Sequence, residues 1–155
     1  MASTGSQWFA NVASSGYAVG NSAMFEDGSS EFFRRTPSGA GNQKTYSYSV
    51  WFKRGNVGSV QYLLRRSGGS TYSYIRINAN NTLAFYNEKA GVSAVSLIPN
   101  QVFRDPTAWY HLLLASDQTQ STSSNRAKLY INGVQVTSFS TESYGIAQNQ
   151  DAERS

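Results

Sequence analysis

The sequence WYHLLLASDQTQSTSSNRAKLYINGVQVTSF, residues 109–139, decides the fold class of this chain. Its first segment, Trp109–Ala115, is apolar on both faces of an extended backbone, which predicts a strand in the centre of a sheet. After a polar loop come two alternating segments, Lys128–Ile131 and Val134–Phe139, joined by Asn132-Gly133. Because Asn-Gly tolerates the positive φ angles of a type I′ turn, these segments predict a two-residue β-hairpin.

The residues that precede this stretch carry the same kind of pattern. In TYSYSVWFK, residues 45–53, aromatic and apolar side chains occupy every second position, as in a half-buried strand. Turn residues then divide the chain into short segments at a spacing of about ten residues, which is typical of a β-sandwich or barrel. The other expected strands and strand-like pieces are Ala23–Phe25, Glu31–Arg35, Val60–Arg65, Tyr72–Ile77, Thr82–Tyr86 and Val92–Leu97, with strand signals ending at Thr141.

Composition agrees with an all-β domain and excludes some chemistry. Tyr, Phe and Trp supply 14% of the 155 residues, and no long stretch repeats apolar residues at a helical period. There is no cysteine, which excludes disulfides and thiolate metal sites. The net charge of +4 could attract an acidic glycan, a membrane surface or nucleic acid, but only 14% of the residues are charged, so it does not choose among them.

The chain predicts one folded domain with two polar ends. We expect residues 1–20 to form a flexible N-terminal arm, residues 21–140 to form the sandwich, and residues 141–155 to form a polar C-terminal tail or a truncated continuation. Residues 1–20 lack the charged start and apolar run of a secretory signal, so we expect synthesis in the cytoplasm. No run approaches the roughly 18 apolar residues of a membrane span, so we expect no membrane insertion.

Four segments, in order along the chain, resemble laminin G-like and pentraxin-like members of the concanavalin A-like superfamily: TYSYSVWFKRGN, TLAFYN, WYHLLLASD and AKLYINGVQVTSF. The segments FRRTPSGAGNQKTYSYSVWFKRGN and QVFRDPTAWYH are similar to a subgroup found in phage and marine viral structural proteins. The resemblance implies an antiparallel two-sheet jelly-roll sandwich with ligand loops at the concave face or at one rim. Family members usually add a returning strand after the hairpin, and the sequence leaves open whether that strand is absent or supplied by a neighbouring subunit.

The carboxylates and the single histidine argue against an enzyme. Glycoside hydrolases of this architecture need two carboxylates about 5–10 Å apart across the scissile bond. No predicted core strand carries an acidic pair at i, i+2. Asp151 and Glu153 have this spacing but lie in the polar tail, and Glu88 and Asp105 are isolated. Ser-His-Asp chemistry would need His111, which we expect instead to be a structural histidine, hydrogen-bonded in or near the core.

Binding sites are the better prediction. Tyr62, Tyr72, Tyr74 and Tyr86 lie on or beside strands and could form a face that binds a ligand such as a sugar, although packing is the simpler role for them. Related domains bind calcium at a loop rim, which makes Asp117 and Asn125 the candidate ligands here, against a loop-capping role for Asp117. No other cofactor is expected.

Nucleic acid is not an expected partner. The basic pairs Arg34-Arg35, Lys53-Arg54 and Arg65-Arg66 alternate across strand faces and form no continuous stripe.

These observations, with the resemblance, predict a non-enzymatic structural and adhesion module of a virion. Examples of such a module are a phage tail fibre, a tail-associated protein or a capsid decoration protein. We expect it to assemble with itself or other virion subunits and to bind a host glycan. A free-standing, extracellular carbohydrate-binding lectin is the alternative, and a glycoside hydrolase is the weakest hypothesis.

Overall fold

The computed structural model describes residues 38–39, 41–68, 71–89, 92–145 and 147–149. The expected N-terminal arm and the expected strand pieces Ala23–Phe25 and Glu31–Arg35 lie outside these residues. Within them the chain forms two antiparallel sheets and no α-helix. The jelly-roll-type sandwich predicted from the sequence is therefore confirmed as a two-layer, all-β architecture.

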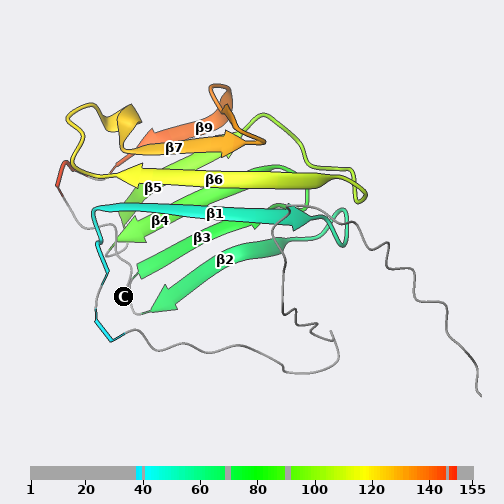
Figure 1. Cartoon of the computed structure of the whole chain (residues 1–155), viewed down its shortest axis with the longest axis horizontal. Helices are drawn as coiled ribbons and strands as arrows, with labels where there is room; N and C mark the ends of the chain where they lie inside the picture. Colours follow the sequence, from blue (N-terminus) through cyan, green and yellow to red (C-terminus); the bar gives the residue numbers. More distant parts are fainter. Residues whose placement is uncertain (1–37, 40, 69–70, 90–91, 146, 150–155) are drawn as a thin grey trace, which may run out of the picture. The chain divides into compact units, whose positions relative to one another are not determined.

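One sheet has four strands and the other has five (Figure 1). The four-stranded sheet has the order β1 (Thr45–Lys53), β6 (Trp109–Asp117), β7 (Ala127–Ile131), β8 (Val134–Gln135). The five-stranded sheet has the order β2 (Gln61–Gly68), β3 (Thr71–Ile77), β4 (Leu83–Lys89), β5 (Val92–Pro99), β9 (Phe139–Tyr144).

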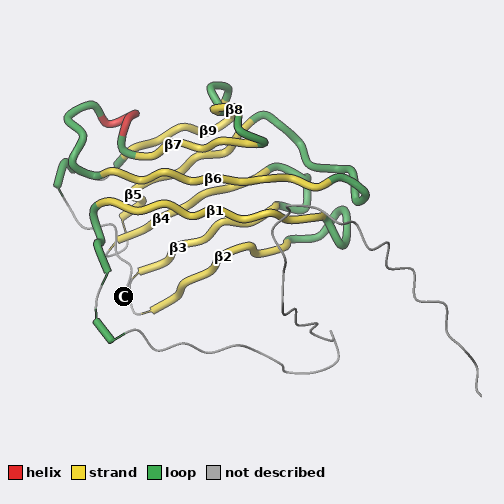
Figure 2. Tube along the Cα trace, in the orientation of Figure 1, coloured by secondary structure: helices red, strands yellow, loops and turns green. Residues whose placement is uncertain are grey.

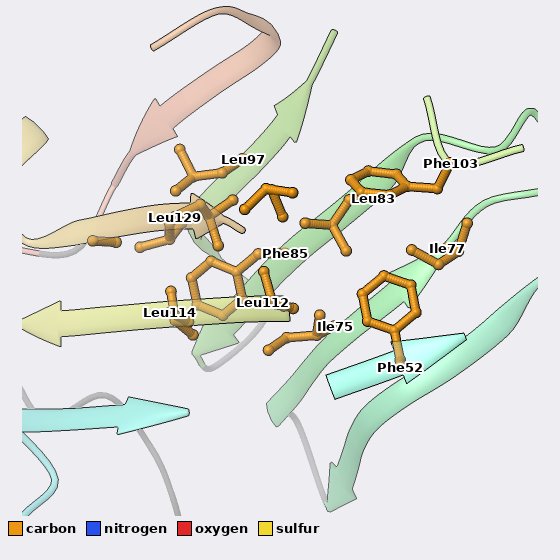
Figure 3. Packing of buried hydrophobic residues seen from close by; sticks show 13 residues of the cluster. Phe52, Ile75, Ile77, Leu83, Phe85, Leu97, Phe103, Leu112, Leu114 and Leu129 are labelled. Atoms are coloured by element: carbon orange, nitrogen blue, oxygen red, sulfur yellow. The ribbon is translucent and has the colours of Figure 1, made fainter. Parts of the chain in front are cut away.

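The core lies between the sheets because each strand turns one set of alternate side chains inward. Figure 3 shows Phe52, Leu112 and Leu129 of the four-stranded sheet facing the five-stranded sheet. Phe103 enters the same core from the loop before β6 and is fully buried. The other core residues labelled in Figure 3 are Ile75, Ile77, Leu83, Phe85, Leu97 and Leu114.

The strand register decides which side chains lie on the outer face of each sheet. In β1 and β6 the side chains of Trp51 and His111 are cross-strand partners on the face opposite the core. In β3 and β4 the partners Tyr74 and Tyr86 lie opposite the core in the same way, since the adjacent Ile75 and Phe85 are buried. Loops and one short 3₁₀ turn at Ser123–Asn125 connect the strands (Figure 2).

The predicted hairpin is present, but its second strand is much shorter than expected. Asn132 has φ 50° and Gly133 has φ 81°, as a type I′ turn requires. The expected strand Val134–Phe139 is only two residues long as β8, and the chain then crosses to the other sheet. There β9 pairs with β5, so the expected end of strand signals at Thr141 is wrong.

A returning strand therefore follows the hairpin within this sequence. The expected domain end at residue 140 falls inside β9, and the backbone N–H of Asn149 donates to the Gln118 carbonyl at 2.8 Å. A strand donated by a neighbouring subunit is not needed at this place in the five-stranded sheet. No described helix has the length and apolar character needed to cross a membrane.

Candidate functional site

The four tyrosines singled out in the sequence come together on the outer face of the five-stranded sheet. Tyr72 and Tyr74 are two residues apart on β3, which places both side chains on one face. The ring centroid of Tyr74 lies 5.2 Å from that of Tyr86 on β4 and 6.0 Å from that of Tyr62 on β2. The Tyr72 and Tyr74 centroids are 5.5 Å apart. Three adjacent strands thus build one aromatic cluster.

Two arginines complete this cluster, which we call the Tyr/Arg face: Tyr62, Arg65, Tyr72, Tyr74, Arg76 and Tyr86. The Arg76 guanidinium carbon lies 4.5 Å from the Tyr74 ring centroid, and the Arg65 guanidinium carbon lies 5.2 Å from that of Tyr62 and 5.6 Å from that of Tyr72. Such cation–π contacts stabilise both partners. The rings are therefore partly covered by guanidinium groups, so the surface offers N–H and O–H groups as well as ring surface.

Hydrogen bonds fix the orientation of this face. Arg76 donates from Nε to Asn78 Oδ1 at 2.8 Å and from Nη1 to the Tyr62 hydroxyl at 3.3 Å. The Tyr86 hydroxyl donates to Glu88 Oε2 at 2.8 Å. Under these side chains Ala84, the cross-strand partner of Arg76, is only 3% exposed. The face is preorganised by packing as well as by polar contacts.

The hydroxyl groups of Tyr62 and Tyr72 have pKa values that are shifted in opposite directions. The hydrogen bond from Arg76, followed by the one from Tyr72, holds the pKa of the Tyr62 hydroxyl below its usual value. The pKa of Tyr72 is raised, chiefly because its hydroxyl is hydrogen-bonded to Tyr62.

A second surface, on the outer face of the four-stranded sheet, was not identified from the sequence as a site. Trp51 on β1 is 64% exposed and Trp109 on β6 is 61% exposed. Between them His111 Nε2 is hydrogen-bonded to Ser49 Oγ at 2.9 Å, and the His111 ring lies tilted by 31° against the Trp51 ring, with centroids 4.9 Å apart. Strand alternation places Trp51 on the other face of β1 from Phe52, and this pattern is the sequence signal from which the surface could have been predicted. We call these four residues the Trp/His face.

His111 is hydrogen-bonded as expected, but it lies on the outer face and not in the core. Leu112 and Leu114 point into the core from β6, and because side chains alternate along a strand, His111 points outward. The Ser49–His111 pair contains two of the three groups of a catalytic triad. No described carboxylate is hydrogen-bonded to the pair.

Asp117 and Asn125, the predicted calcium ligands, both line one open cavity of about 580 Å³ at the end of β6. The Asp117 carboxylate is already engaged there, because Oδ1 accepts from the Thr119 N–H and hydroxyl and Oδ2 accepts from Gln120 Nε2. These bonds lower the pKa of Asp117, the Thr119 hydroxyl contributing most.

A calcium ion needs six to eight oxygen ligands. The described residues contain no group of three or more acidic or histidine side chains that could hold a metal. One engaged carboxylate and one amide do not fit a calcium ion, and the contacts of Asp117 are those of a loop cap.

The remaining described carboxylates are held in local contacts. Glu88 accepts from Tyr86, and Glu142 Oε1 accepts from the Tyr144 hydroxyl at 2.9 Å. Asp105 Oδ1 accepts from the N–H and hydroxyl of Thr107, which lowers the pKa of Asp105. Each of these acids is bonded to a residue two positions away in sequence.

The basic pairs of the sequence are divided by the fold. Lys53 is exposed on the four-stranded sheet, whereas the adjacent Arg54 is only 3% exposed and points inward. Arg65 belongs to the Tyr/Arg face on the other sheet, and Arg34-Arg35 lie outside the described residues. The described members therefore form no common basic stripe.

Two packed antiparallel sheets define the described part of this chain as a β-sandwich with a polar, aromatic outer face. A family model described as the concanavalin A-like lectin/glucanases superfamily matches residues 26–153. The chain belongs to this superfamily, as the resemblance predicted. No curated protein and no solved structure gives a significant match.

Proposed function

We propose that this chain is a non-enzymatic adhesion module that binds carbohydrate on the Tyr/Arg face. The observation that carries the proposal is the convergence of four tyrosines and two arginines from three strands on one outer face. Tyrosine hydroxyls and guanidinium groups form hydrogen bonds with sugar hydroxyls, while the ring surface that the arginines leave open can pack on the C–H face of a sugar ring. Membership of a superfamily that includes lectins supports the same function.

The non-enzymatic part of the proposal rests on the carboxylates. Glu88, Asp105, Asp117 and Glu142 each accept a hydrogen bond from a residue two positions away, which ties them to local structure. A virion is the proposed setting, supported by the resemblance of the Phe33–Asn56 and Gln101–His111 segments to phage and marine viral structural proteins.

Replacing Tyr74 tests the proposed face. We expect Tyr74→Ala to weaken glycan binding by at least about tenfold, because Tyr74 contacts the other three tyrosines and Arg76. A glycan array with the wild-type chain and the variant measures this. Tyr130→Ala is the matched control, since Tyr130 is half-buried on the opposite sheet and pairs with Leu113. No binding by the wild-type chain, or equal loss in both variants, would refute the proposal.

Subunit assembly is a second candidate function, favoured by the Trp/His face. Tryptophan is enriched at the energetic centres of protein interfaces, and two tryptophans more than 60% exposed on one sheet are unusual. A second copy of the chain, or another virion subunit, would cover them. This face lies on a different sheet from the Tyr/Arg face, so assembly and glycan binding do not compete for residues.

Light scattering tests self-assembly. We expect the wild-type chain to form dimers or larger species, with or without calcium, and the double variant Trp51→Ala, Trp109→Ala to raise the dissociation constant by about 30-fold or more. Val134→Ala is the control, because Val134 is 71% exposed on the edge strand β8. A wild-type chain that is monomeric at all concentrations, or a double variant of unchanged mass, would contradict assembly through this face.

A further inference from the structure

We infer that the Tyr/Arg face selects an acidic carbohydrate, whose carboxylate or sulfate group binds between Arg65 and Arg76. This inference rests on the proposed function and adds the chemical class of the ligand. Both guanidinium carbons lie against the ring of Tyr62, at 5.2 Å for Arg65 and 5.9 Å for Arg76 from its centroid. Two like charges are thus held beside one ring.

The register of the sheet explains how the arginines meet. Tyr62 is the cross-strand partner of Arg76, and Arg65 is the partner of Tyr74, with a bulge after Tyr62. Each arginine of this face therefore lies across from a tyrosine of the neighbouring strand. Cross-strand neighbours of this kind lie within side-chain reach.

The charge between the two arginines is not neutralised by the protein within the described residues. Arg76 bonds the amide of Asn78 and the hydroxyl of Tyr62, which carry no charge. Glu88 is the acid on the same face, and its Oε2 accepts from the Tyr86 hydroxyl. Both guanidinium groups lie against the Tyr62 ring, so an anion that accepts N–H donors from both of them offsets two positive charges.

The stacked geometry favours an oxyanion over a nucleic acid base. Arg76 lies over the Tyr74 ring and Arg65 over the rings of Tyr62 and Tyr72, so these surfaces are partly occupied. A base would need an open ring to stack on. Guanidinium forks held in place by rings and hydrogen bonds instead match the planar geometry of a carboxylate or the oxygens of a sulfate.

Binding of the full chain to three polysaccharides tests the inference: dextran, dextran sulfate and polygalacturonate. Dextran and its sulfate share one backbone, while polygalacturonate carries carboxylates alone. We expect at least about tenfold tighter binding to one or both acidic polymers than to dextran, weakened by added salt. The polymer that binds identifies sulfate or carboxylate as the recognised group. Equal affinity for dextran and for both acidic polymers would overturn the inference.

Charge variants separate local recognition from overall charge. We expect the double variant Arg65→Gln, Arg76→Gln to lose the preference for acidic polymers over dextran. The double variant Arg65→Lys, Arg76→Lys should bind the acidic polymers several-fold more weakly, because lysine lacks the planar guanidinium group. The control Lys53→Gln, Lys128→Gln removes the same charge from the other sheet and should bind within about twofold of wild type. Thermal melts of each variant confirm that it is folded.

The outcomes distinguish this inference from the proposed function. If acidic polymers bind but the Lys53→Gln, Lys128→Gln control loses as much affinity as the double arginine-to-glutamine variant, the attraction is non-specific and the inference fails. If neutral glycans bind through Tyr74 and the arginine pair has no effect, the inference fails while the proposed function stands. Tighter binding of an oligo(dT) probe that displaces the acidic polymer would overturn the inference in favour of nucleic acid.

Discussion

Replacing Phe103 with alanine is expected to lower the free energy of unfolding by about 3–5 kcal/mol, the usual effect of removing a buried aromatic ring. Phe103 is fully buried although it lies in a loop, and its ring centroid is 5.1 Å from that of Tyr110 and 6.0 Å from that of Phe52. It therefore closes one end of the core between the sheets (Figure 3).

Chemical denaturation measures this effect, with Val102→Ala as the control. Val102 is adjacent in sequence but 40% exposed, so its truncation should change stability by about 0.5 kcal/mol or less. A loss below about 1 kcal/mol for Phe103→Ala would mean that the ring does not fill the core. Equal losses for both variants would show that the loop as a whole matters, and not the buried ring.

The second large effect is expected at Arg54, where alanine should cost about 3 kcal/mol. Arg54 Nη1 donates to the Phe103 carbonyl at 3.1 Å, and Nη2 donates to the Asn56 carbonyl at 2.7 Å and to Asn81 Oδ1 at 3.3 Å. Three loops thus converge on one buried guanidinium. Its removal leaves acceptors that water reaches poorly, which is the costly arrangement for a polar group.

The adjacent residue supplies the control for Arg54. Lys53→Ala removes the same charge from an exposed position and should change the unfolding free energy by about 0.5 kcal/mol or less. Arg54→Lys keeps the charge but lacks the planar guanidinium group. Its loss of unfolding free energy should therefore be more than half of that of Arg54→Ala. An Arg54→Ala variant as stable as wild type would show that the three loops hold together without the guanidinium.

Strands with clear alternation could be predicted from the sequence, and one without it could not. TYSYSVWFK places Phe52 inward and Trp51 outward, and the structure confirms this pattern in β1. The segment FSTESY carries four exposed residues in succession, because β9 is the last of the described strands in its sheet and buries little on either face. Its polar composition resembles a tail, which is why the strand was missed.

The candidate site was predictable in part. Period-two spacing puts Tyr72 and Tyr74 on one face, so half of the tyrosine cluster follows from β3 alone. The positions of Arg65 and Tyr62 depend on the bulge in β2, which shifts the register by one residue and has no clear sequence signal. The burial of Arg54 beside an exposed Lys53 depends on distant loops, and local sequence does not indicate it.

The most direct test of the central claim maps the ligand on the chain. The glycan with the strongest array signal is titrated into the ¹⁵N-labelled wild-type protein, and amide chemical shifts are followed residue by residue. We predict that the perturbed amides cluster on β2, β3 and β4 around Tyr62, Tyr74 and Tyr86. Perturbations centred on Trp51 and Trp109 of the other sheet, or none at saturating glycan, would contradict the assignment of the Tyr/Arg face as the ligand-binding surface.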